Sequence, residues 1–96
     1  MQKALSLIFE HLQLQDTASS FDLKFQKLAG YLDNLVSYDF NKLISILYRI
    51  DVSEEKAKQA LANKKEDETN GVILARLLIE REQQKMVYRE KYKSGR

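Results

Sequence analysis

The absence of proline is the feature that most limits what this chain can form. The sequence contains no proline and only three glycines, Gly30, Gly71 and Gly95. Tight turns between short strands depend on these two residue types, whereas both are unfavourable inside helices. The 96 residues, 44% of them hydrophobic, are enough for one hydrophobic core. We therefore expect a single all-α domain over residues 1–93, with residues 94–96 as a disordered C-terminal tail.

Apolar residues recur with helical spacing and predict a small bundle of four to five helices. Leu5, Ile8, Phe9 and Leu12 lie on one stripe, which predicts a helix over about residues 2–14. Similar stripes predict helices over about 20–37, 39–50, 54–63 and 70–92. The last helix is the longest. Its start, VILARLLI at 72–79, is apolar on nearly all sides, which predicts a central position in the bundle.

The predicted helix over 20–37 leaves two points open. The segment FDLKF at 21–25 alternates apolar and polar residues, a pattern that also suits a strand. Gly30 costs a helix interior about 1 kcal/mol relative to alanine. We expect Gly30 either to allow close approach of another helix or to mark a kink. Ser19 is the predicted N-cap, with Asp22 three residues later.

The segment YRIDVSEEKAKQAL at 48–61 resembles two helices joined by a short turn. Ser53 is the predicted N-cap of the second helix, and Glu54 and Glu55 suit the positive end of its dipole. Val52 is expected to pack on Ala57 as a hydrophobic staple. A DNA-reading helix presents its first residues to the bases, where phosphates would repel two glutamates. The segment is therefore interpreted as a structural corner rather than a DNA-reading motif.

Residues able to support catalysis or metal binding are scarce. The chain has no cysteine, and its one histidine, His11, borders the apolar stripe of the first helix. A conventional zinc site needs several such ligands, and no glycine-rich phosphate loop is present. DETN at 67–70 lacks the acidic spacing of a calcium loop. We predict no catalytic residue, metal, cofactor or small-molecule substrate, and hence no enzyme.

The sequence shows no sign of a membrane segment or a targeting signal. The longest apolar run is VILARLLI, which contains Arg76, whereas a spanning helix needs about 20 apolar residues. MQKALSLIFEHLQ at the N-terminus lacks the cleavage site of a signal peptide. We therefore expect a soluble, cytoplasmic protein without a membrane partner.

A basic stripe on the last predicted helix is the best indication of a binding surface. Residues 69–96 carry seven basic and three acidic side chains, a net charge of +4. The stripe consists of Arg81, Lys85, Arg89 and Lys93, one every four residues, with Tyr88 and Tyr92 along its edge. It suits a solvated face, an acidic protein partner or nucleic acid. Nucleic acid is less favoured because Glu80, Glu82 and Glu90 reduce the positive field.

A second set of residues on this helix indicates self-association. Arg76, the only charge in VILARLLI, is expected to pair with Glu80 or with another helix, or to face a partner subunit. Ile79, Met86 and Val87 continue the apolar line past the part that a small bundle can cover, which predicts a homodimer. The sequence thus favours a self-associating helical protein-interaction or structural module. The alternative is a nucleic-acid-binding accessory protein that uses the basic stripe.

Overall fold

The computed structural model describes residues 2–16 and 20–94, with side chains as far as Lys91. These residues form five α-helices and no strand, which confirms the predicted all-α bundle with a long C-terminal helix. The helices are α1 (Gln2–Leu12), α2 (Phe21–Tyr38), α3 (Phe40–Ile50), α4 (Glu54–Ala62) and α5 (Asn70–Ser94).

The structure shows how the start of α2 is formed. The segment FDLKF is helical, so the strand alternative is wrong. The N-cap is Ser20, whose side-chain oxygen accepts a hydrogen bond from the Leu23 N–H at 3.2 Å. The predicted cap, Ser19, lies outside the described residues. So do Gly95 and Arg96 of the predicted tail, whereas Ser94 is the last residue of α5.

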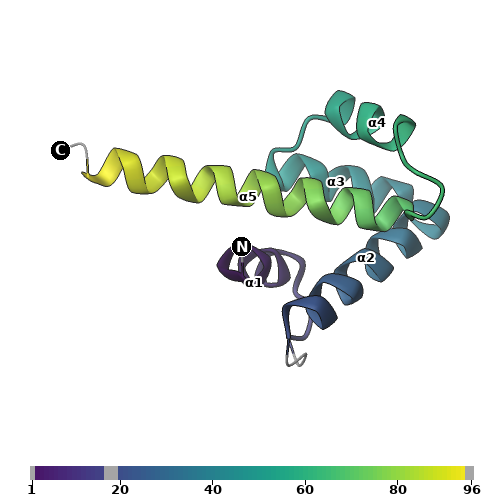
Figure 1. Cartoon of the computed structure of the whole chain (residues 1–96), viewed down its shortest axis with the longest axis horizontal. Helices are drawn as coiled ribbons and strands as arrows, with labels where there is room; N and C mark the ends of the chain where they lie inside the picture. The colour runs from purple at the N-terminus through teal and green to yellow at the C-terminus, as the bar shows by residue number, and fades with distance from the viewer. Residues whose placement is uncertain (1, 17–19, 95–96) are drawn as a thin grey trace.

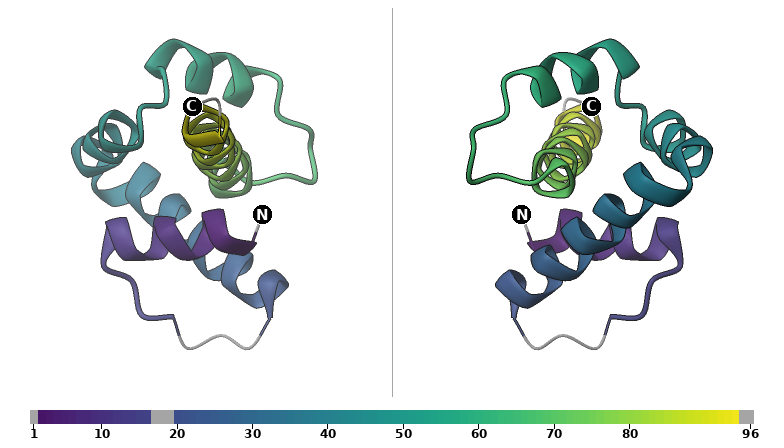
Figure 2. Two further views of the ribbon diagram at one scale, coloured as in Figure 1. Left: turned by 90° about the vertical axis from the view of Figure 1, so that its left-hand side faces the viewer. Right: turned by 90° about the vertical axis from the view of Figure 1, so that its right-hand side faces the viewer.

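Helix α5 occupies the centre of the bundle, as the apolar run VILARLLI predicts. It packs most extensively on α2 and also contacts α1, α3 and α4. Figure 2 shows α5 nearly end-on, with α4 on one side of it and α1 on the other. In Figure 1 the C-terminal half of α5 continues well past the other helices.

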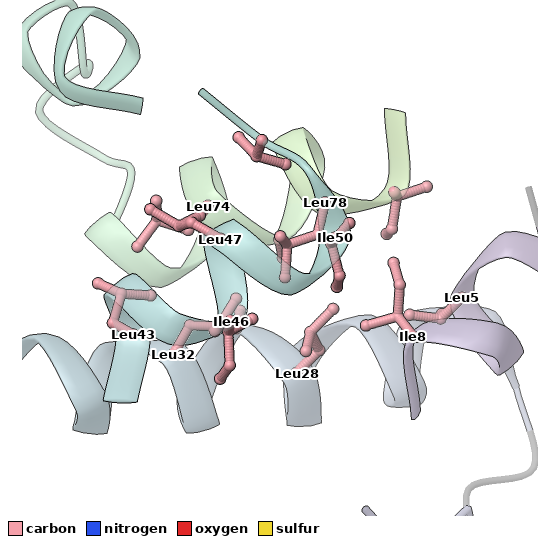
Figure 3. Close-up of a cluster of buried hydrophobic side chains, with 14 of the residues drawn as sticks. Leu5, Ile8, Leu28, Leu32, Leu43, Ile46, Leu47, Ile50, Leu74 and Leu78 are labelled. Carbon is pink, nitrogen blue, oxygen red and sulfur yellow. The ribbon is translucent and has the colours of Figure 1, made fainter. Parts of the chain in front are cut away.

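The core combines the apolar stripes of all five helices. Figure 3 shows leucine and isoleucine side chains from α1, α2, α3 and α5 converging in one cluster. The largest fully buried apolar side chains are Leu5, Ile8, Phe9, Leu28, Leu32, Leu43, Ile50, Leu74, Leu78 and Ile79. Helix α4 contributes only Ala57 as a buried residue, so its attachment to the core is the slightest. Burial of these side chains supplies the main driving force for folding.

Close contact between α2 and α5 depends on Gly71, not on Gly30. A Cβ atom on Gly71 would lie 1.9 Å from the carbonyl oxygen of Ala29, so no larger residue fits without moving the backbone. The Gly71 N–H also donates to Oδ1 of Asp33 at 2.7 Å, which anchors the start of α5 on α2. Gly30 is exposed, and a Cβ there would meet nothing within 4 Å. The expectation that Gly30 admits a neighbouring helix is therefore wrong.

The turn between α3 and α4 is a Schellman motif closed by an aspartate. Asp51 adopts the left-handed conformation, with φ 68° and ψ 43°. The N–H of Asp51 donates to the Tyr48 carbonyl at 3.2 Å, and the N–H of Val52 donates to the Leu47 carbonyl at 2.8 Å. Ser53 then caps α4 by accepting from the Lys56 N–H at 3.2 Å, as predicted.

Candidate interaction surface

Two members of the basic stripe hold the C-terminal end of α3. Nε of Arg81 donates to the carbonyl oxygen of Asp51 at 3.0 Å, and its Nη2 lies 2.8 Å from Oδ2 of the same residue. Nζ of Lys85 donates to the carbonyl oxygen of Ile50 at 2.8 Å. Cations are favourable at this end of a helix because its last carbonyls have no partner within the helix and carry partial negative charge. Arg81 and Lys85 thus fix the α3–α4 corner against α5.

Glu82 is a buried carboxylate beneath the basic stripe, and the sequence analysis did not identify it as such. Only 2% of its surface is exposed, and it is the one buried charged residue in the part of the chain that the structure describes. Its Oε1 lies 3.3 Å from Nη2 of Arg89, and its Oε2 lies 3.5 Å from Nζ of Lys85. Because a buried charge requires partners, these two cations stabilise Glu82, although its Oε2 accepts no hydrogen bond within the described structure. One signal was available: Glu82 follows Ala75 and Leu78 at spacings typical of a buried helix face.

The outer part of the basic stripe is more accessible. The Arg89 side chain is 63% exposed, although its Nε also donates to the Lys85 carbonyl at 3.2 Å. Tyr88 is 61% exposed. An open depression of about 530 Å³ is lined by Arg81, Gln84, Lys85, Tyr88 and Arg89. The side chains of Tyr92 and Lys93, the last members of the stripe, lie outside those described.

Arg76 points away from the core and pairs with the loop before α5. Its Nη1 donates to Oε2 of Glu68, and its side chain is 56% exposed. Glu80, the partner expected from helical spacing, instead lies 3.7 Å from Nζ of Lys56 on α4. Arg76 therefore belongs to an exposed ion pair with the loop before its own helix, and not to either of the expected pairs, with Glu80 or with another helix.

The three apolar residues predicted to form a dimer surface face different ways. Ile79 is buried in the core and is not accessible to a partner. Met86 is half-buried against the core, beside a depression shared with Lys3 and Leu7 of α1. Val87 alone is largely exposed, at 57%. Only this last residue is available on the outer face of α5.

Val87 lies on an exposed row of side chains that we term the α5 seam: Glu80, Gln84, Val87 and Lys91. These residues are spaced by four, three and four positions, which places them on one side of the helix. Gln83 and Tyr88 flank the row, and all six residues line one shallow depression of about 440 Å³. Acidic Glu80 stands at one end of the seam and basic Lys91 at the other.

Two exposed ion pairs shift the acidity of their carboxyl groups. The hydrogen bond from Arg81, together with its positive charge, lowers the pKa of Asp51. The hydrogen bond from Arg76, followed by that from the Lys65 N–H, lowers the pKa of Glu68. Both effects favour the charged carboxylate. The two ion pairs stabilise the loops on either side of α4.

No site for a metal or for histidine chemistry stands out among the described residues. His11 is exposed at the end of α1, and its backbone carbonyl accepts a hydrogen bond from Nη1 of Arg49 at 2.9 Å. Over residues 2–16 and 20–94, no group of three or more His, Cys, Asp or Glu residues is placed to hold a metal ion. Within the same residues, no helix is both long and apolar enough to cross a membrane.

Comparison with known protein families, curated proteins and solved structures finds no match to this chain.

Proposed function

We propose that this chain is a small helical protein-interaction module that associates with itself through the α5 seam and has no catalytic activity of its own. The observation that carries the proposal is the projection of α5 beyond the bundle with Val87 and Tyr88 largely exposed (Figure 1). Val87 and Tyr88 line one depression together with Glu80 and Lys91, and an apolar or aromatic centre with a charged rim is typical of a contact surface.

The proposal is tested by measuring molar mass across a range of concentrations by light scattering after gel filtration. The wild-type chain should move from monomer to dimer as concentration rises. Val87→Glu should remain monomeric, because a carboxylate would then be desolvated at the centre of the contact. Tyr48→Ser is the matched control, since Tyr48 is 88% exposed but lies on α3. A wild-type chain that stays monomeric at millimolar concentration would overturn the proposal.

A second candidate function is nucleic-acid binding by the basic stripe. It is favoured by the depression that brings Arg81, Lys85 and Arg89 together beside exposed Tyr88, since such a surface suits a phosphate backbone and a stacked base. It is weakened by the carboxylate and carbonyl oxygens that the three cations already contact.

Salt dependence distinguishes the two candidates. Binding of a fluorescent single-stranded oligonucleotide should weaken steeply as salt rises if phosphates are contacted. Arg89→Glu should then abolish binding, whereas Arg49→Glu, a reversal on α3, should change it little. An absence of binding at low salt would eliminate this candidate.

A further inference from the structure

Helix α5 carries a single stripe with heptad spacing, of which the first half is covered and the second is not. The stripe consists of Ile73, Leu77, Glu80, Gln84, Val87 and Lys91, separated alternately by four and three residues. This spacing keeps the whole row on one side of a helix, as in a coiled coil. Ile73 is buried and Leu77 is half-buried against the core. From Glu80 onwards every member of the row is exposed.

Helix α4 lies along the covered half of this stripe. It packs on α5, and its Lys56 reaches Glu80, the first residue of the exposed half. Figure 1 shows α4 alongside the N-terminal half of α5, whose C-terminal half then continues without a neighbour on that side. The α5 seam is therefore the continuation of a helix-packing face past the point where α4 stops covering it.

We propose that the α5 seam is covered by the α5 seam of a second copy, running antiparallel, with Glu80 of each copy against Lys91 of the other. This inference rests on the self-association proposed above and adds its geometry. In antiparallel coiled coils the two kinds of core position pair with each other, which sets Gln84 opposite Val87 in the two inner layers. A two-fold axis makes each contact occur twice and closes the assembly at two copies.

The charges at the two ends of the seam favour this direction over a parallel one. A parallel pair would set Glu80 beside Glu80 and Lys91 beside Lys91, whereas the antiparallel pair joins opposite charges at both ends of the seam. Helix α4 begins with exposed Glu54 and Glu55, and Lys56 places this acidic turn at the Glu80 end. The basic end of the second copy would thus meet acidic groups. Nucleic acid would meet the same carboxylates and be repelled.

Charge reversal provides the first test. Glu80→Lys and Lys91→Glu should each weaken dimerisation by about tenfold or more, because each converts two attractive contacts into two repulsive ones. An equimolar mixture of the two variants should dimerise again, since every end contact in the mixed pair joins opposite charges. The matched controls are Glu66→Lys and Lys64→Glu in the exposed α4–α5 loop, which should leave dimerisation unchanged.

Cysteine cross-linking tests the direction of the helices, and the chain offers a clean background because it has no cysteine. A mixture of Glu80→Cys and Lys91→Cys should form a disulfide-linked heterodimer under mild oxidation. Neither variant alone should cross-link readily, because the antiparallel arrangement separates equivalent residues by about 16 Å along the axis. A disulfide requires Cα atoms within about 7 Å.

The outcomes separate this inference from the proposed function. A monomeric wild-type chain overturns both. A wild-type dimer that Val87→Glu disrupts, but whose charge-reversed variants do not recover on mixing, retains the seam and overturns the antiparallel register. Cross-linking of Glu80→Cys with itself likewise indicates a parallel pair. A dimer unaffected by Val87→Glu, Glu80→Lys and Lys91→Glu places self-association on another surface and overturns the seam.

Discussion

The two halves of α5 belong to one continuous helix but lie in opposite surroundings. The first half is embedded between α2, α1 and α4, with Leu74, Ala75 and Leu78 at most 1% exposed. The second half projects from the bundle (Figure 1), and its Val87 and Tyr88 are largely exposed. Between the two halves, Glu82 forms ion pairs with Lys85 and Arg89, which lie further along the same helix. One helix thus acts as core at one end and as surface at the other.

The largest effect is expected at the buried end. Gly71→Ala should lower the free energy of unfolding by about 3 kcal/mol or more, because the new Cβ would overlap the Ala29 carbonyl and force α5 away from α2. Urea denaturation followed by circular dichroism measures this. A loss below about 1 kcal/mol would mean that the two helices separate freely and that the first half of α5 is not held as described.

The next effect concerns the junction between the halves. Glu82→Gln should cost about 1–2 kcal/mol, because it removes the charge that faces Lys85 and Arg89 while keeping the shape of the side chain. Glu80→Gln should change the free energy of unfolding by under about 0.5 kcal/mol, because the Glu80 side chain is 58% exposed and is paired only at the surface. Equal effects of the two substitutions would show that Glu82 does not behave as a buried charge.

A gain in stability is expected at Gly30 on α2, the residue next to Ala29, where α5 approaches most closely. Gly30→Ala should raise the free energy of unfolding by about 0.5–1 kcal/mol, since alanine is the better helix former and the site is open. Urea denaturation followed by circular dichroism measures this gain as well. Opposite signs for Gly30→Ala and Gly71→Ala would show that helix contact, not glycine content, controls the buried half of α5. A loss at Gly30 would contradict the open environment described for it.

The smallest effect is a dependence of stability on pH at the Asp51–Arg81 ion pair. Arg81 lowers the pKa of Asp51, so this pair stabilises the fold above the usual carboxyl value of 3.8 and ceases to do so as pH falls through the lower folded value. The melting temperature of the wild type should therefore fall more steeply below about pH 4 than that of Asp51→Asn. Asp67→Asn, in the exposed loop, is the control and should follow the wild type. Parallel curves for all three proteins would rule out a contribution from the Asp51–Arg81 pair.

The helices could be predicted from sequence because each has a stripe that its own residues define. The cap Ser53 was also readable, since a cap acts within a few residues. The role of Gly71 was not, because its neighbour Ala29 is far away in sequence and only the fold brings the two together.

The candidate surface was predicted less completely, for the same reason. Arg81, Lys85 and Arg89 line one depression, but nothing in their spacing indicates that the end of α3 lies beside the first two. Nor does it indicate that Glu82 is buried beneath the last two. Val87 and Ile79 were assigned to one outward line, but only Val87 is exposed, because helical spacing does not show how deeply neighbouring helices cover a residue.

The place of α5 at the end of the described chain affects the order in which the protein can fold. During synthesis, helices α1–α4 are made before Leu74 and Leu78, so the apolar faces of Ile8 and Leu32 first exist without the helix that covers them. Short helices without such a partner are marginal in water. The bundle should therefore become cooperative only when its last helix arrives, and the absence of proline spares it the slow isomerisation step. Because Glu80 directly follows the last core residue, Ile79, a chain long enough to present the seam has already synthesised its core.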